Sequence, residues 1–298
     1  MTGIALLAAC LVAGVLAAQL IPRPGRLARA LNWWILRIAL PALVLTLLPR
    51  LALERELWFL VAAMWLVFFG GWAVAAIAGA HYGWSRARIG ALALVAGLGN
   101  TAFTGYPLIA ALRGPEALPF AAVADQLGCF IALSTGGVIA ASWYGGERAH
   151  AGALIRRIAL FPPFLSCIVG LLVGQLGGWP AGVDAVLRSV GATLSPLALL
   201  AIGLQLRWRI DASQLHAVTI GLGWKLAAAP ALVWLLGTAV GAGGLLLVVG
   251  VLQAAMGPMV SAAILAGEHE LDTAVANAML AIGVLVSLAS VPLIDALL

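Results

Sequence analysis

Long stretches of apolar residues, separated by short polar stretches, follow one another along the whole chain. Each has about 20 residues, the length that an α-helix needs to cross the hydrocarbon core of a bilayer. The pattern therefore predicts an all-α polytopic membrane protein with ten transmembrane helices and no room for a soluble domain. The predicted spans are residues 3–21, 31–49, 57–80, 89–112, 118–144, 158–177, 185–206, 215–238, 244–266 and 273–297.

The fourth and the ninth of these spans are interrupted. In the fourth span, the stretch Gly97–Pro107 contains three glycines, a proline and several small polar residues, and glycine and proline both weaken a helix. The ninth span has a second interruption at Gln253–Pro258. Unwound backbone at membrane depth is tolerated only where protein buries it or where it lines a wet cavity. Two broken spans therefore predict a binding site of the kind found in transporters.

A short internal repeat supports the division of the chain into two halves. Residues 11–20 align without gaps with residues 167–176, matching at Gly, Leu, Gln and Leu. Because each half would hold an odd number of spans, the halves must cross the membrane in opposite directions. We expect two inverted five-helix repeats, 1–146 and 158–298, joined by a cytoplasmic linker 147–157. Such a pseudo-two-fold would bring the two broken helices together at the bilayer midplane.

The composition agrees with a membrane protein, since 64% of residues are hydrophobic, 9% are charged and the mean hydropathy is +1.11. The net charge of +5 comes from arginines spread over the loops, with no basic run interleaved with aromatics, so we expect no nucleic-acid partner. The excess of arginine on one face predicts that both termini lie on the non-cytoplasmic side. The three cysteines are far apart, each within an apolar span, and indicate neither a disulfide nor a metal site.

The break in the fourth span offers the clearest candidate chemistry. A half-helix that begins near Thr104–Pro107 would point free backbone N–H groups and the positive end of its dipole at a cavity, where an anion is the natural ligand. The alternative is a packing kink whose polar groups bond to neighbouring backbone. The candidate substrate-binding residues are Asn100, Thr101, Thr104, Gly105 and Pro107 in the fourth span, and Gln253, Met256, Gly257 and Pro258 in the ninth.

Two charged residues lie inside predicted spans, where ionisable side chains are rare and usually functional. Asp125 in the fifth span could carry a proton during transport, or it could be hydrated from the outer side. Lys225, the only lysine in the chain, lies about ten residues into the eighth span. It could pair with Asp125 or attract an anionic substrate, and packing against a backbone carbonyl is the alternative.

Enzyme signatures are missing from the sequence. His269-Glu270 has no second histidine at metalloprotease spacing, and no Gly-x-Ser-x-Gly elbow occurs. There is also no phosphate-binding loop with a lysine. We therefore expect neither an enzyme nor a cofactor.

The stretch Asn100–Leu108 resembles the fourth-helix motif of the auxin efflux carrier family. Further segments look like bacterial members of that family in the same order, namely Asp125–Gly128, Ser195–Leu204, Lys225 with Pro230, and Ala255–Ala266. The resemblance covers nearly the whole chain. It implies the inverted-repeat fold shared with bile-acid and NhaA-like transporters, with a scaffold of helices 1, 2, 6 and 7 and a transport domain made of the others. It also implies a bacterial inner-membrane location and a homodimer formed through the scaffold.

For function, the resemblance implies alternating-access transport of small organic anions such as malonate, malate or auxin-like carboxylates, with Asn100 facing the substrate. Two residues depart from the family pattern: Gly257 precedes Pro258 where relatives have proline directly after Ala-Met, and His269 replaces a common tyrosine. The first departure concerns the shape of the ninth-helix break. Two alternatives stay open, a sodium-coupled symporter of the bile-acid type and a membrane sensor or scaffold that binds a ligand without moving it.

Overall fold

The computed structural model describes residues 2–51, 54–146, 151–205 and 211–298. Within these ranges the chain is helical and forms no strand, apart from an isolated antiparallel bridge between Gly99 and Pro258. The expectation of an all-helical protein is therefore confirmed. Residues 147–150 of the predicted linker lie outside the described ranges, and the rest of it belongs to α10 (Ala151–Ala159).

Six helical segments in the described ranges are long and apolar enough to cross a membrane. They are Pro24–Arg50, Arg55–Tyr82, Pro115–Gly145, Ala181–Gln205, Ser213–Ala239 and Thr273–Leu297. Three shorter apolar helices cover Leu7–Leu20, Pro162–Gln175 and Gly244–Ala254. The predicted spans agree with these helices to within a few residues, except that the helical segment of the second span begins seven residues before the predicted position 31 and that the fourth and ninth spans are split in two. A membrane protein with several spans is thus confirmed, whereas the count of ten crossings and the inverted repeat remain predictions.

The chain divides into two compact units, and each draws segments from both halves of the sequence. Unit 1 consists of Met1–Glu54, Ala102–Ala122 and Ala159–Leu206, and unit 2 consists of Arg55–Thr101, Val123–Ile158 and Arg207–Leu298. The first, second, sixth and seventh predicted spans fall in unit 1, as the family resemblance implies for the scaffold. The stretch 102–122, at the end of the fourth span and the start of the fifth, also groups with unit 1, which the resemblance did not imply.

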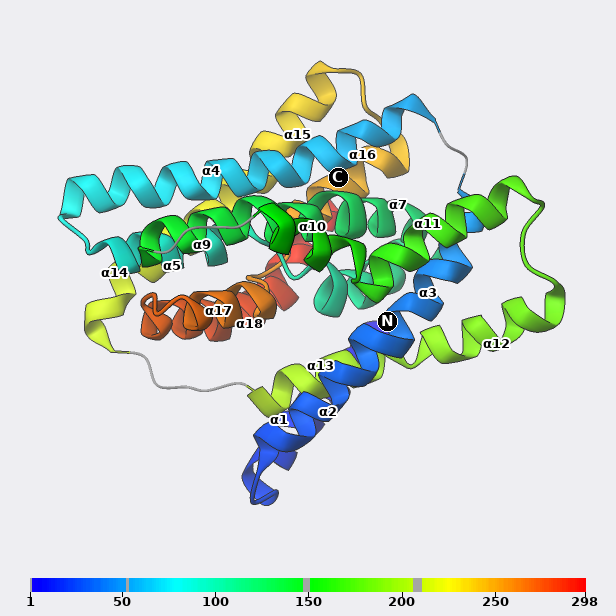
Figure 1. The fold of residues 1–298 in the computed structure, drawn as a ribbon, viewed down its shortest axis with the longest axis horizontal. Coiled ribbons are helices and arrows are strands. Elements are labelled where there is room, and N and C mark those ends of the chain that lie inside the picture. Colours follow the sequence, from blue (N-terminus) through cyan, green and yellow to red (C-terminus); the bar gives the residue numbers. More distant parts are fainter. Residues whose placement is uncertain (1, 52–53, 147–150, 206–210) are drawn as a thin grey trace. The chain divides into compact units, whose positions relative to one another are not determined.

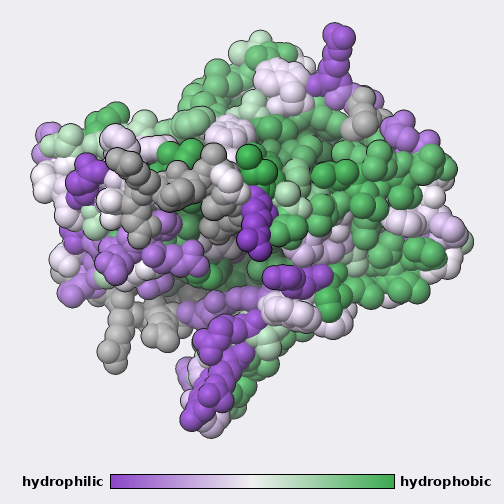
Figure 2. Space-filling model, viewed as in Figure 1, coloured by the Kyte–Doolittle hydropathy of each residue, from purple (hydrophilic) through white to green (hydrophobic). Residues whose placement is uncertain are grey.

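Unit 1 is built from pairs of closely packed helices. Helix α1 packs on α13, and α11 and α12 pack on α3. A side chain at Gly14 would collide with the backbone of Leu200 and Gly203, so this glycine lets α1 and α13 approach closely. Hydrophobic side chains cover the surface over α3, α11 and α12 (Figure 2). The helices of unit 1 are α1 (Thr2–Leu20), α2 (Pro24–Trp34), η1 (Ile35–Ala39), α3 (Leu40–Leu47), η2 (Leu48–Arg50), α6 (Tyr106–Arg113), η5 (Pro115–Ala117), α11 (Pro162–Gln175), α12 (Ala181–Ala192) and α13 (Leu194–Gln205).

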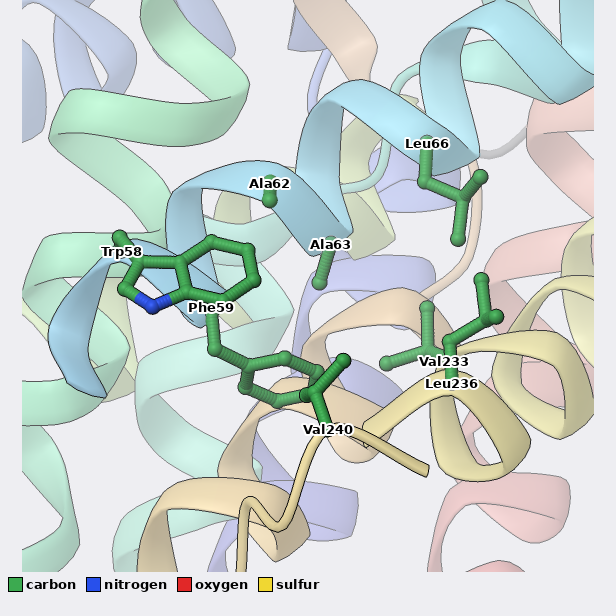
Figure 3. Close-up of a pocket in the computed structure, with 8 residues that line it drawn as sticks. All are labelled: Trp58, Phe59, Ala62, Ala63, Leu66, Val233, Leu236 and Val240. Atoms are coloured by element: carbon green, nitrogen blue, oxygen red, sulfur yellow. The ribbon is translucent and has the colours of Figure 1, made fainter. Parts of the chain in front are cut away.

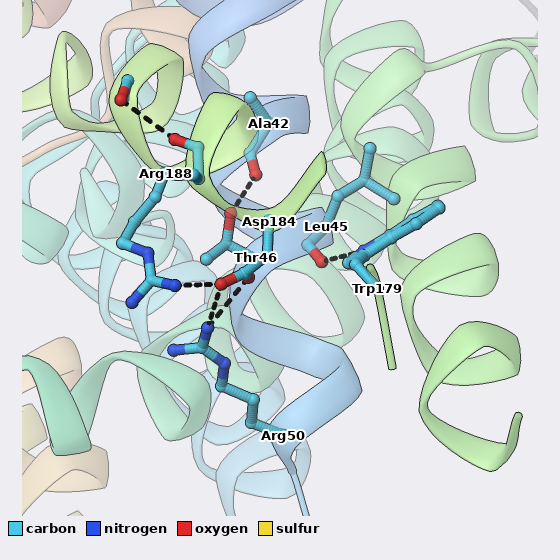
Figure 4. A network of polar contacts seen from close by, with 9 residues as sticks. Ala42, Leu45, Thr46, Arg50, Trp179, Asp184 and Arg188 are labelled. Atoms are coloured by element: carbon cyan, nitrogen blue, oxygen red, sulfur yellow. Dashed lines mark hydrogen bonds and ion pairs between the residues drawn. The ribbon is translucent and has the colours of Figure 1, made fainter. Parts of the chain in front are cut away.

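A polar network at one end of unit 1 joins α12 to the end of the second span (Figure 4). Arg50 donates to both carboxylate oxygens of Asp184, at 2.8 and 2.7 Å, and Arg188 also bonds to Asp184. The indole N–H of Trp179 donates to the carbonyl oxygen of Leu45 at 2.8 Å. Both arginines are at least half exposed, so the network fixes geometry and adds little to stability.

Unit 2 contains the remaining helices (Figure 1). In this unit α4 packs against α5, where Gly71 lets the backbone of Gly97 come close, and α15 and α16 pack against α4. Three helices continue across the boundaries between the units, namely η4 (Thr101–Gly105), α7 (Leu118–Val123) and α10. The helices of unit 2 are η3 (Arg55–Leu57), α4 (Trp58–Tyr82), α5 (Arg86–Gly97), η6 (Ala124–Cys129), α8 (Phe130–Ala132), η7 (Leu133–Gly137), α9 (Val138–Gly145), α14 (Ala212–Gly223), η8 (Trp224–Ala228), α15 (Ala229–Ala239), α16 (Gly244–Ala254), α17 (Val260–Glu268) and α18 (Thr273–Leu297).

Candidate functional site

The fourth span breaks after Gly97, where α5 ends. Leu98 is extended, with φ −112° and ψ 120°, and helical backbone returns at Thr101 in the π-helical turn η4. The second half-helix therefore begins a few residues earlier than the predicted Thr104–Pro107. Pro107 is the second residue of α6, which continues η4 without a break, so it lies inside the half-helix and not at its N-terminus. The glycines around Leu98, and not the proline, mark the actual break.

The ninth span breaks after Ala254, where α16 ends, and α17 begins at Val260 after the extended residue Met259. The two unwound segments pair as antiparallel backbone. Asn100 donates its N–H to the carbonyl oxygen of Gly257 at 2.8 Å, and Met259 donates its N–H to the carbonyl oxygen of Leu98 at 3.0 Å. We call this pairing of residues 98–100 with 257–259 the crossover. The predicted meeting of the two broken helices is thus present, and it lies wholly within unit 2.

The carboxylate of Asp125 lies beside the crossover. Thr101 Oγ1 donates to Asp125 Oδ1, and Gln126 Nε2 donates to Asp125 Oδ2 at 2.6 Å. All three side chains are buried, with at most 2% exposed. Asp125 and Gln126 are consecutive residues of the π-helical turn η6. The alternative interpretation, that Asp125 is hydrated from the outer side, does not fit this burial.

Cys129, at the end of η6, also touches the crossover, since its thiol donates to the carbonyl oxygen of Gly99 at 3.3 Å. The sequence predicted no site role for Cys129 or for Gln126. The spacing of Asp125 and Cys129, four residues apart, was the available signal because it places them on one face of a helix.

The ammonium of Lys225, on the π-helical turn η8, also lies at the crossover. Its Nζ donates to the carbonyl oxygen of Ala254 at 2.9 Å, and the side chain is 1% exposed. This bond corresponds to the alternative that the sequence left open, in which Lys225 packs against a backbone carbonyl. Ala254 is the last residue of α16, where the helix dipole is negative, so a cation is stabilised there. Gly99 makes room for it, since a Cβ at this position would lie 2.9 Å from Nζ.

Residues of the ninth span also surround the crossover. Gln253 is fully buried, and its Nε2 donates to the carbonyl oxygen of Thr101 at 3.3 Å, which ties the end of α16 to the start of η4. Gly257 lies against α18, because a Cβ there would be 2.7 Å from the carbonyl oxygen of Gly283 and 2.9 Å from Ser287 Oγ. Met256, which directly precedes Gly257 in the sequence, is also fully buried.

Most of the predicted site residues therefore gather around one point of unit 2. They are Asn100, Thr101, Asp125, Lys225, Gln253, Met256, Gly257 and Pro258. Thr104, Gly105 and Pro107 are buried in the stretch that groups with unit 1. Among the described residues, no group of three or more His, Cys, Asp or Glu side chains is placed to hold a metal ion. A separate apolar groove lies between α4 and α15 (Figure 3), and none of the predicted site residues lines it.

The comparison with known families now bears on this geometry. A family model described as a membrane transport protein matches residues 4–294. The chain belongs to this family. It is the auxin efflux carrier family, the one that the motifs around Asn100 and Lys225 resemble. The chain therefore has a membrane transport role and works in a lipid bilayer.

Two relatives of this auxin efflux carrier family member come from archaea. An uncharacterized transporter of Methanothermobacter thermautotrophicus is 28% identical over 273 residues, which cover 89% of this chain and 87% of the relative. An uncharacterized transporter of Methanocaldococcus jannaschii is 27% identical over 189 residues, 60% of each chain. Both names indicate transport and neither names a substrate. The crossover must therefore be interpreted from its own chemistry.

Proposed function

We propose that this chain is a secondary transporter of small organic anions such as malonate, malate or auxin-like carboxylates. The observation that carries the proposal is the backbone pairing of Asn100 with Gly257, which holds two broken helices together inside an apolar unit. The half-helices η4 and α17 begin directly after this pairing, and α17 has no side-chain cap at Met259. Uncapped amides at a helix N-terminus favour an anion.

The polar side chains around the crossover suit a carboxylate substrate. Asn100, Thr101 and Thr104 would bond the carboxylate, while Gly105 and Pro107 shape the half-helix that carries them. Gln253, Met256, Gly257 and Pro258 would form the opposite wall.

The two buried charges would adjust the charge balance of the site. Lys225 bonds a neutral carbonyl, so its positive charge can attract an anion. Asp125, which accepts from Thr101 and Gln126, would link transport to a proton.

For the architecture, we propose ten transmembrane helices in two inverted repeats, with alternating access to the crossover. The contacts of two aligned glycines support the repeat. Gly14 lies against Leu200, and Gly170, its partner in the alignment of residues 11–20 with 167–176, lies against the side chain of Leu48 and near the carbonyl oxygen of Val44. Val44 lies opposite Leu200 when the offset of this alignment is continued without gaps beyond residue 20. We further propose a bacterial inner-membrane location with both termini outside the cytoplasm, and a homodimer.

Counterflow in liposomes tests the proposal. Protein reconstituted in vesicles that are loaded with unlabelled malonate or malate should take up the labelled anion. Asn100→Ala should lose this exchange, and Asn277→Ala, an exposed asparagine on α18, should keep it. If the unmodified protein exchanges no mono- or dicarboxylate although such acids raise its melting temperature, it is a sensor or scaffold and not a carrier.

Replacement of sodium by choline separates the proposal from the sodium-coupled alternative. Sodium prefers several oxygen ligands, and the carboxylate of Asp125 already accepts two hydrogen bonds. We expect the same exchange rate in both salts. Uptake that stops in choline would favour the symporter of the bile-acid type.

A further inference from the structure

An apolar groove between α4 and α15 lies apart from the crossover and has no part in the proposed transport site. Its volume is about 250 Å³. Figure 3 shows its lining side chains, which come from the first turns of α4, from α15 and from Val240 directly after α15. All of them are aliphatic or aromatic, and the indole nitrogen of Trp58 is the one polar atom among these side chains. The groove therefore offers almost no hydrogen bonds, and its occupant must be apolar.

The groove has a buried floor and an exposed rim. Phe59 and Val233 on its floor are buried, whereas Trp58 and Val240 on its rim are each 56% exposed. Both helices belong to segments long and apolar enough to cross a membrane, Arg55–Tyr82 and Ser213–Ala239. The groove of this membrane protein therefore opens towards the hydrocarbon of the bilayer, where lipid acyl chains are the available apolar molecules.

Charged residues precede α4, the helix whose first turns line the groove. Glu54 and the η3 residues Arg55 and Glu56 are all exposed and come shortly before α4. Trp58 at the start of α4 is the type of residue found at the level of the lipid headgroups. One arginine and two carboxylates complement a headgroup that carries both a phosphate and an ammonium, better than a purely anionic one. We propose that the α4/α15 groove binds an acyl chain of a zwitterionic phospholipid, phosphatidylethanolamine, whose headgroup contacts Arg55 and Glu56.

The floor of the groove connects this lipid to the crossover. The ring of Phe59 lies against α15 and α16, since a Cβ at Gly237 or Gly250 would be 2.8 or 2.7 Å from it. Gly250 is one helical turn before Gln253, which bonds to Thr101. A bound acyl chain that holds Phe59 in place would thus support the half-helix α16 up to its broken end. The binding of the lipid does not depend on the proposed transport function, although this consequence for the crossover rests on it.

Native mass spectrometry of the purified full chain, mixed with phosphatidylethanolamine or phosphatidylglycerol, tests the binding. Ala62→Trp would fill the groove from its exposed lining position, and Ala73→Trp places the same side chain at an exposed position further along α4. We expect the unmodified protein and Ala73→Trp to retain phosphatidylethanolamine in preference to phosphatidylglycerol. In Ala62→Trp the retained fraction should fall by roughly tenfold. Equal retention by all three proteins, or a preference for phosphatidylglycerol, would overturn the proposal.

A second variant and a second readout guard against misfolding of Ala62→Trp. Arg55→Gln leaves the groove intact, and it should lower the retention of phosphatidylethanolamine because a headgroup contact is lost. Hydrogen exchange of residues 250–257 should slow when phosphatidylethanolamine is added to the unmodified protein, but not in Ala62→Trp. Unchanged retention in Arg55→Gln would refute the headgroup contact, and unchanged exchange would refute the support of α16.

Discussion

Asn100 donates its backbone N–H to the carbonyl oxygen of Gly257 at 2.8 Å, so two unwound segments from opposite halves of the chain satisfy each other inside an apolar unit. Backbone polar groups without partners are costly at membrane depth. Neither helix could therefore break there alone. The pairing explains why the fourth and ninth spans are interrupted together, and it fixes the backbone beside which Asp125, Lys225 and Gln253 lie.

Gly257→Ala should damage the crossover. The added Cβ would lie 2.7 Å from the carbonyl oxygen of Gly283 and 2.9 Å from Ser287 Oγ, so the unwound segment would have to move away from α18. We expect the free energy of unfolding to fall by about 1–3 kcal/mol, as for other overpacked sites, together with a loss of anion exchange. Gly182→Ala is the control, because nothing lies within 4 Å of the added atom. Thermal melting in detergent gives the stability, and equal melting of both variants would contradict the prediction.

The sequence predicted the helical spans and the two breaks because both depend on local properties. An apolar run of membrane length specifies a span whatever its neighbours are. The glycines at positions 97 and 99 weaken the helix locally, at the positions they occupy. The meeting of the breaks followed from the repeat of residues 11–20. That inference also needed the odd number of predicted spans in each half.

The partners of individual side chains could not be predicted in the same way. Lys225 bonds to the carbonyl oxygen of Ala254, and this atom is accessible only because α16 ends at that residue. The start of the second half-helix at Thr101 depends on a π-helical turn, which no residue type specifies. Cys129 contacts Gly99 because two spans pack against each other. The periodicity of a sequence does not predict which spans pack together.

Asp125→Asn should remove the proposed proton link while keeping the size of the side chain. The carboxylate accepts from Thr101 and from Gln126, whereas an asparagine would direct an NH₂ group at one of these donors. If Asp125 carries the proton, the exchange rate of the variant should no longer vary with pH, because the amide does not ionise. Asp211→Asn, at an exposed position before α14, serves as control and should keep the profile of the unmodified protein. The same pH profile in Asp125→Asn would show that another group is responsible.

Lys225→Met should weaken the binding of the anion. Methionine has a similar length but no charge, so the carbonyl oxygen of Ala254 loses its donor and the crossover loses its cation. An unsatisfied buried acceptor costs about 1–3 kcal/mol, and we expect the KM for a carboxylate to rise by roughly tenfold or more. Lys225→Arg should not restore binding, because the wider guanidinium has no room next to Gly99. The dependence of exchange on substrate concentration measures the effect, and an unchanged KM in Lys225→Met would exclude a role for this charge in anion binding.

Two aligned glycines of unit 1 should differ in their tolerance of a methyl group, although the repeat places them in equivalent positions. A Cβ at Gly14 would lie 3.0 Å from Gly203 Cα and even closer to the carbonyl oxygen of Leu200, so it would meet backbone of α13 that cannot rotate away. A Cβ at Gly170 would lie 3.2 Å from the nearest atom, Leu48 Cβ, and 3.5 Å from the next. The first helix pair must separate to accept the methyl group, whereas the second needs a shift of a few tenths of an ångström.

We therefore expect Gly14→Ala to cost about 1–3 kcal/mol of stability and Gly170→Ala to cost much less. Alanine also favours a helix more than glycine, by about 1 kcal/mol, and this gain offsets the small crowding at Gly170 but not the backbone collision at Gly14. Thermal melting of both variants in the same detergent measures the difference, with Gly152→Ala as the reference because its added atom touches nothing within 4 Å. Equal loss at Gly14 and Gly170 would mean that α1 approaches α13 no more closely than α11 approaches α3, contrary to the packing of unit 1.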